Sequence, residues 1–143
     1  MARRRETGLF VDEGFLALVV VLVALVIRLL HAWFTAKYNP LAADLVLDAA
    51  GYDRWARVLV WGGELPATRL MQAPLYPWFV SIVYRIFGPS PTAVRVVQAI
   101  LGTASVGFTV TIARRLLGSS AAGILAGLLM ACYLPLVFYE GQV

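Results

Sequence analysis

The stretch AAGILAGLLMACYLPLVFY, residues 121–139, decides the fold, because it carries no charged side chain. Its length approaches the roughly 20 residues that a helix needs to cross the hydrocarbon of a bilayer. Residues 14–30 are apolar apart from Arg28, and residues 94–117 are apolar between arginines. The chain of 143 residues is 61% hydrophobic with a mean hydropathy of +0.80, whereas soluble domains are close to half apolar. The sequence therefore predicts an all-α integral membrane protein.

Basic residues at the ends of the apolar runs predict the orientation. Arg3, Arg4 and Arg5 precede the first run, and Arg114 and Arg115 close the second. Such residues collect on the cytoplasmic side, so we expect a multi-pass protein with a cytoplasmic N-terminus, in a bacterial inner (plasma) membrane. No small-x-small cleavage pattern follows the first run, which favours an uncleaved first helix over a signal peptide.

We expect a single membrane module over residues 1–143 with three transmembrane helices. The expected segments are a cytoplasmic lead at 1–14, a transmembrane helix at 15–34, an external loop with an amphipathic helix at 39–73, a short membrane helix at 74–88, and transmembrane helices at 92–117 and 121–139. The 74–88 helix is short for a full crossing, so a re-entrant or interfacial position is favoured. The alternative is four spanning helices, which would place Arg114 and Arg115 outside, against the positive-inside rule.

The external loop contains three aspartates beside a membrane surface. Asp48 falls at the start of the expected amphipathic helix, where a carboxylate accepts backbone N–H bonds and meets the positive end of the helix dipole. That position makes it the strongest candidate for chemistry, although an N-cap needs no catalytic role. Asp53 stands four residues before Arg57, which favours an ion pair. Together with Asp44 these carboxylates could hold a divalent cation, but no ligand spacing supports one, so no metal or cofactor is predicted.

Two further ionisable residues lie near the outer ends of the expected spans. Glu140 would face the same side as Asp48, and two carboxylates at one cavity suit general-base chemistry on a hydroxyl or amine; the alternative for Glu140 is an interfacial end-cap. Arg28 either extends its side chain to the headgroups or binds an anionic group. His31 is expected to be an interfacial residue, and Cys132 a packing residue.

Several function classes lack support in the sequence. It contains no nucleophile elbow, P-loop, dinucleotide fingerprint or zinc-ligand spacing. No basic surface interleaved with aromatics lies outside the spans, so no nucleic-acid partner is expected. Small residues in the later spans, among them Gly102, Gly107 and Gly123, instead favour close packing of helices in lipid.

The order of several motifs resembles a known family. Asp48-x-x-x-Tyr52-x-x-x-Ala56, after a first transmembrane helix, is similar to the acidic motif in the first external loop of the GT-C glycosyltransferases. The branch it resembles contains the protein O-mannosyltransferases (dolichyl-phosphate-mannose-protein mannosyltransferase-like) and the aminoarabinose transferases. Segments similar to that family follow in the same order, and the likeness extends from about residue 15 to the end: APLYP at 73–77, YRIFG at 84–88, VRVVQAILG at 94–102, ARRLLG at 113–118 and PLVFYEG at 135–141.

The resemblance implies a polytopic enzyme that takes a sugar from a polyprenyl-phosphate donor. The sugar would go to an acceptor on the outer face of the membrane. The family's loop aspartate acts as general base toward the acceptor, and this role carries over to Asp48; Ala49 stands where the family often has a glutamate. Glu140, Arg28 and Tyr52 are carried over as substrate-binding residues.

Members of that family have many more membrane helices than this sequence predicts. We therefore expect the chain to be the N-terminal part of such an enzyme and too short to be active alone. Its expected partners are the lipid-linked sugar donor, membrane lipids, and the remainder of the enzyme or another membrane subunit. The alternative function is a small non-enzymatic membrane accessory or assembly protein.

Overall fold

The computed structural model describes residues 13–39, 45, 48–64 and 73–142, and within them every element is an α-helix. The expected lead before Glu13, and Asp44 in the external loop, lie outside the described residues. The helices are α1 (Glu13–Tyr38), α3 (Asp48–Trp61), α4 (Leu75–Phe87), α5 (Pro91–Leu117), α6 (Ser120–Ala131) and α7 (Leu134–Glu140).

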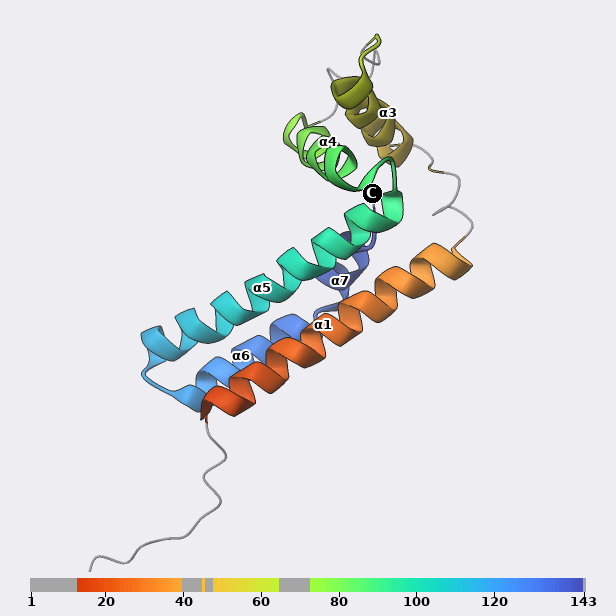
Figure 1. Ribbon diagram of the computed structural model, residues 1–143. Coiled ribbons are helices and arrows are strands. Elements are labelled where there is room, and N and C mark those ends of the chain that lie inside the picture. Colours follow the sequence, from red (N-terminus) through yellow and green to blue (C-terminus); the bar gives the residue numbers. More distant parts are fainter. Residues whose placement is uncertain (1–12, 40–44, 46–47, 65–72, 143) are drawn as a thin grey trace, which may run out of the picture.

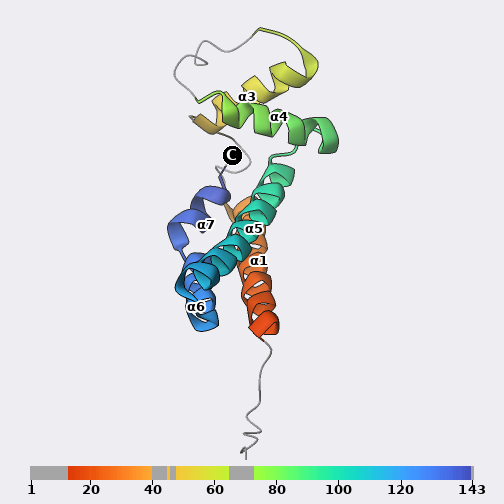
Figure 2. The same ribbon diagram turned by 90° about the vertical axis from the view of Figure 1, so that its left-hand side faces the viewer.

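The described helices form two groups. Helices α1, α5 and α6 run alongside one another as a bundle, and α3 and α4 form a helical hairpin across one end of it (Figures 1 and 2). The end of the described chain after α7 and the beginning of α3 lie close together at this end in both views. We call it the hairpin end. The last turn of α5, with Arg114 and Arg115, lies at the opposite end.

Length and composition identify two candidate membrane spans among the described residues, α1 with 26 residues and α5 with 27. Helices α6 and α7 together qualify as a third, bent by 53° at their junction. Large apolar side chains such as Leu22, Leu30 and Phe108 are exposed on the outer faces of the bundle, as lipid-facing residues are in a membrane. The structure thus confirms an all-α membrane protein with two to three candidate spans. Helix α4 has 13 residues, and its re-entrant or interfacial position, with four spanning helices as the alternative, stays a prediction.

Two expected helix boundaries differ from the structure. The single helix expected at 121–139 is divided, because α6 ends at Ala131 and α7 begins at Leu134. Pro135 lies in the first turn of α7, where it has no N–H to donate and its ring would clash with the carbonyl of Ala131 in a continuous helix. The first helix also continues past the expected end at Phe34 to Tyr38, just before Asn39-Pro40.

Small residues allow the bundle helices to approach closely. Its core contains Val20 and Ala24 of α1, Val106 and Val110 of α5, and Ala131 of α6. A Cβ atom at Gly123 would lie 2.8 Å from the carbonyl oxygen of Val110, a backbone atom that cannot easily move. The predicted small-residue packing of α6 on α5 is therefore present.

We expect Gly123→Ala to destabilise the bundle by about 1–3 kcal/mol, the usual cost of overpacking, and so to lower the midpoint of thermal unfolding in detergent. Gly107→Ala is the matched control, because the atom closest to its new Cβ is 3.7 Å away. An equal midpoint for the two variants would contradict the close α5–α6 contact.

The hairpin has a core of its own. Ala56 of α3 packs with Val80, Val83 and Tyr84 of α4 and with Val94 of α5. Val94 belongs to the first turns of α5, so this core fixes the hairpin on the bundle. The side chains at the start of α3 are thereby held over the ends of the spans.

Candidate functional site at the hairpin end

A buried ion pair joins the first and last described helices at the hairpin end. The Arg28 Nε atom donates to Glu140 Oε2 at 2.7 Å, and the two side chains are 1% and 20% exposed. The extension of Arg28 to the headgroups, one of its two predicted roles, is wrong, because α7 brings an acid against it. Glu140 likewise is no simple end-cap. Its carboxylate lies against Gly102 of α5, in the space that any larger residue there would occupy.

The carbonyl groups that follow the ion pair are bound by side chains of α5. Arg95 Nε donates to the Gly141 carbonyl oxygen at 3.0 Å. The Gln98 amide nitrogen, in the orientation that suits its neighbours, donates to the carbonyl oxygens of Glu140 and Gln142, each at 3.1 Å. The last carbonyls of a helix have no partner within the helix, so these bonds hold the end of α7 in place. Arg95 is 3% exposed.

Two tyrosines connect this end of α7 to the start of α3. The Tyr76 hydroxyl donates to the Gln98 amide oxygen at 3.0 Å. The Tyr76 ring meets the Tyr52 ring edge-on, with centroids 4.9 Å apart. Burial, the largest cause, raises the pKa of Tyr76 above its ordinary value. Arg28, Tyr76, Arg95, Gln98 and Glu140 together are called the hairpin-end cluster below.

Asp48 is the first residue of α3, as predicted, and its side chain is exposed. It stands one helical turn before Tyr52 and therefore on the same face of α3. The beginning of α3 lies beside the C-terminal end of the described chain (Figure 2). The structure thus places Asp48 at the same end of the molecule as Glu140, and the contact between the Tyr52 and Tyr76 rings connects α3 to the hairpin-end cluster.

Asp53 is bound within the hairpin. It accepts from Arg57 Nε at 2.8 Å, which confirms the predicted i,i+4 pair, and from the Tyr84 hydroxyl at 2.5 Å. This bond to Asp53 raises the pKa of the Arg57 guanidinium. Burial, together with the bond to the Asp53 carboxylate, raises the pKa of Tyr84 well above its ordinary value. Asp53 therefore joins α3 to α4 through its bond to Tyr84.

A metal centre finds no support in the described ranges, where no three His, Cys, Asp or Glu side chains come together. His31 packs edge-on against Phe138, and its ring occupies the space beside Gly141. Cys132 is exposed at the end of α6, so its predicted role in packing within the described residues is wrong.

Sequence reasoning did not single out Arg95, Gln98 or Tyr76 as site residues. A signal was present, since Arg95, Gln98 and Gly102 follow at three- and four-residue spacing and so share one face of α5. An arginine inside an apolar helix is also costly unless partners hold it. The partner itself, the end of α7, depends on the break before Pro135.

The helical bundle and its buried charged cluster define a class, an all-α membrane protein with a polar centre at one end. Comparison with known proteins narrows this class. The family model for dolichyl-phosphate-mannose-protein mannosyltransferase matches residues 71–142, which is half of the chain. The chain belongs to this family of membrane glycosyltransferases. No curated protein and no solved structure gave a match.

The matched range covers most of the candidate site. It includes Tyr76, Arg95, Gln98 and Glu140 of the hairpin-end cluster, as well as the segments from 73–77 onward that resemble the family. Asp48, Tyr52 and Arg28 precede it. The role of Asp48 and the expectation of an N-terminal part of a longer enzyme therefore stay predictions.

Proposed function

We propose that the chain belongs to a GT-C glycosyltransferase that moves a sugar from a polyprenyl-phosphate donor to an acceptor on the outer face of the membrane. The family match over residues 71–142 carries this proposal, because the matched segments supply most of the hairpin-end cluster. The proposed acceptor site is the hairpin end, opposite Arg114 and Arg115. Arginines at the end of a span favour the cytoplasmic side.

In the proposed reaction, an acceptor oxygen or nitrogen bonds to the anomeric carbon of the sugar as the bond from that carbon to the phosphate oxygen breaks. The electron pair of the broken bond leaves on the polyprenyl phosphate. The acceptor proton goes to Asp48, which acts as general base. An exposed carboxylate in the first turn of α3, at the same end of the molecule as the hairpin-end cluster, suits this role.

The charges of the hairpin-end cluster support binding of a phosphate-bearing donor. Arg28 and Arg95 bring two positive charges and Glu140 one negative charge. The Arg28 Nη2 atom is buried and has no hydrogen-bond partner among the described residues, and an unsatisfied buried donor is costly. In this proposal, Arg28 binds the phosphate group of the donor and Glu140 positions Arg28. Tyr52 lies on the side of the acceptor.

A transfer assay tests this function. Membranes that contain the chain together with the remainder of the enzyme are incubated with a polyprenyl phosphate bearing radiolabelled mannose, and the label that leaves the lipid-soluble fraction is measured. We expect faster loss of label from the lipid than in membranes without the chain. Equal rates in the two membranes, with the chain folded and inserted, would overturn the proposed transfer and favour a non-enzymatic accessory protein.

A further inference from the structure

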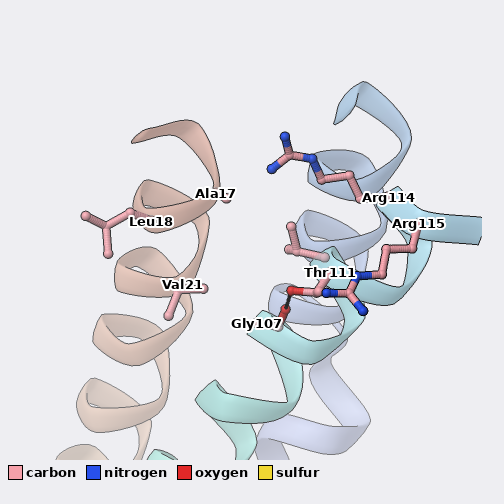
Figure 3. Close-up of a pocket in the computed structure, with 8 residues that line it drawn as sticks. Ala17, Leu18, Val21, Gly107, Thr111, Arg114 and Arg115 are labelled. Carbon is pink, nitrogen blue, oxygen red and sulfur yellow. Dashed lines mark hydrogen bonds between the residues drawn. The ribbon is translucent and has the colours of Figure 1, made fainter. Parts of the chain in front are cut away.

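A groove at the end of the bundle opposite the cluster is not used by the proposed transfer. It lies between α1 and α5 and encloses about 560 Å³. Figure 3 shows Ala17 and Val21 of α1 across from Gly107 and Thr111 of α5, with Arg114 and Arg115 at the end of the groove. Gly107 deepens the groove, because a Cβ atom there would be 3.7 Å from Val21 Cγ2.

The lining is apolar along the helices and basic at one end. From Gly107 to Arg115 the groove follows about 12 Å of α5 at 1.5 Å per residue. This depth is close to one leaflet of a hydrocarbon core about 30 Å thick. The Thr111 hydroxyl, which lines this stretch, donates to the Gly107 carbonyl oxygen at 2.9 Å. The groove therefore presents an apolar wall to its contents over the depth of a leaflet.

The two arginines are not equivalent. Arg114 Nη2 donates to Glu13 Oε2 at 2.8 Å, and Glu13 also accepts from Ser120. In the part of the chain that the structure describes, Arg115 forms no ion pair, and its side chain bends back along α5 toward Thr111 (Figure 3). Among the described residues, Arg115 therefore brings to the groove one positive charge that no acidic side chain balances.

We propose that the α1–α5 groove binds one anionic phospholipid, with its headgroup phosphate on Arg115 and an acyl chain along Val21 and Gly107. The charge of Arg115 selects an anionic headgroup, and the apolar wall suits an acyl chain. This site is distinct from the donor site, because the hairpin-end cluster lies at the other end of α5.

Lipid binding by the purified protein, measured by native mass spectrometry, tests the proposal. The probes are dioleoyl-phosphatidylglycerol and dioleoyl-phosphatidylcholine. We expect tighter binding of phosphatidylglycerol, and Arg115→Gln to weaken it about fivefold, the effect of one arginine at an anionic surface. Arg54→Gln is the matched control, since Arg54 is exposed on α3, at the hairpin end. Equal loss of binding in both variants, or no loss in either, would overturn the site.

A second variant distinguishes the groove from a surface charge effect. Gly107→Leu fills the groove but leaves Arg115 in place, and we expect it to weaken binding of both lipids. Unchanged binding by folded Gly107→Leu would overturn the acyl-chain position.

A cysteine at Leu18, which is 54% exposed, tests whether a second copy of the chain occupies the groove in place of a lipid. Efficient disulfide-linked dimers from Leu18→Cys in a Cys132→Ala background would show a second copy in the groove and contradict a lipid.

Discussion

Asp48→Asn is expected to lower sugar transfer by at least about 100-fold, the lower end of the effect of general acid–base catalysis, with normal expression and insertion. Asparagine keeps the size of the side chain and its ability to accept a hydrogen bond at the start of α3, but it cannot take the acceptor proton at neutral pH. The measurement is the initial rate of radiolabel transfer, divided by the amount of folded chain in the membrane.

The matched control is Asp53→Asn, the same substitution five residues later on the same helix. Asp53 binds Tyr84 and Arg57, so we expect this variant to lower thermal stability and to keep most of the transfer per folded molecule. A transfer rate close to that of the wild type for Asp48→Asn would remove Asp48 from the role of base. Equal losses for the two variants would indicate a structural effect of the hairpin.

Glu140→Ala is expected to lower the free energy of unfolding by about 3 kcal/mol, because removal of one partner of a buried ion pair leaves the other charge uncompensated. Arg28 is that charge, with a side chain only 1% exposed. The measurement is the unfolding midpoint in detergent, followed by circular dichroism.

A double substitution separates the ion pair from the loss of side-chain volume. Replacement of both partners by apolar residues is often neutral or stabilising, so Arg28→Met with Glu140→Met should recover most of the stability that Glu140→Ala loses. The double variant should still fail to bind the donor, since the proposed phosphate ligand Arg28 is gone. A Glu140→Ala protein as stable as the wild type would contradict the importance of the pair for the fold.

Much of the fold is predictable from the sequence because a helix that crosses the hydrocarbon of a bilayer needs a long apolar run. Charge-free or nearly charge-free runs identify α1, α5 and the region of α6, and Gly88, Pro89 and Pro91 separate α4 from α5. Asp48 at the start of α3 and the Asp53–Arg57 pair follow from local rules of helix spacing and capping. These features depend on residues close together in the chain.

The rest depends on contacts between distant segments. Arg28 and Glu140 are 112 residues apart, and no local pattern indicates that α7 turns its acid toward α1. The bend of 53° between α6 and α7 originates at Pro135, yet its direction depends on packing against α5 at Gly102. The contact of Arg95 also depends on this bend, because its partner is the backbone carbonyl group of Gly141 just after α7. Residue spacing does not predict such a partner.

The proposed transfer requires the hairpin to lie on the outer side of the membrane. Arg114 and Arg115 favour the cytoplasm at the other end, but the hairpin also carries exposed arginines such as Arg54 and Arg85, so the charge pattern needs a direct test. Single cysteines in a Cys132→Ala background, at exposed Arg54 and at exposed Ala121 of α6, are treated with a membrane-impermeant maleimide on intact cells. We expect labelling at position 54 without permeabilisation and at position 121 only after it. The reverse pattern would place the hairpin in the cytoplasm and contradict transfer on the outer face.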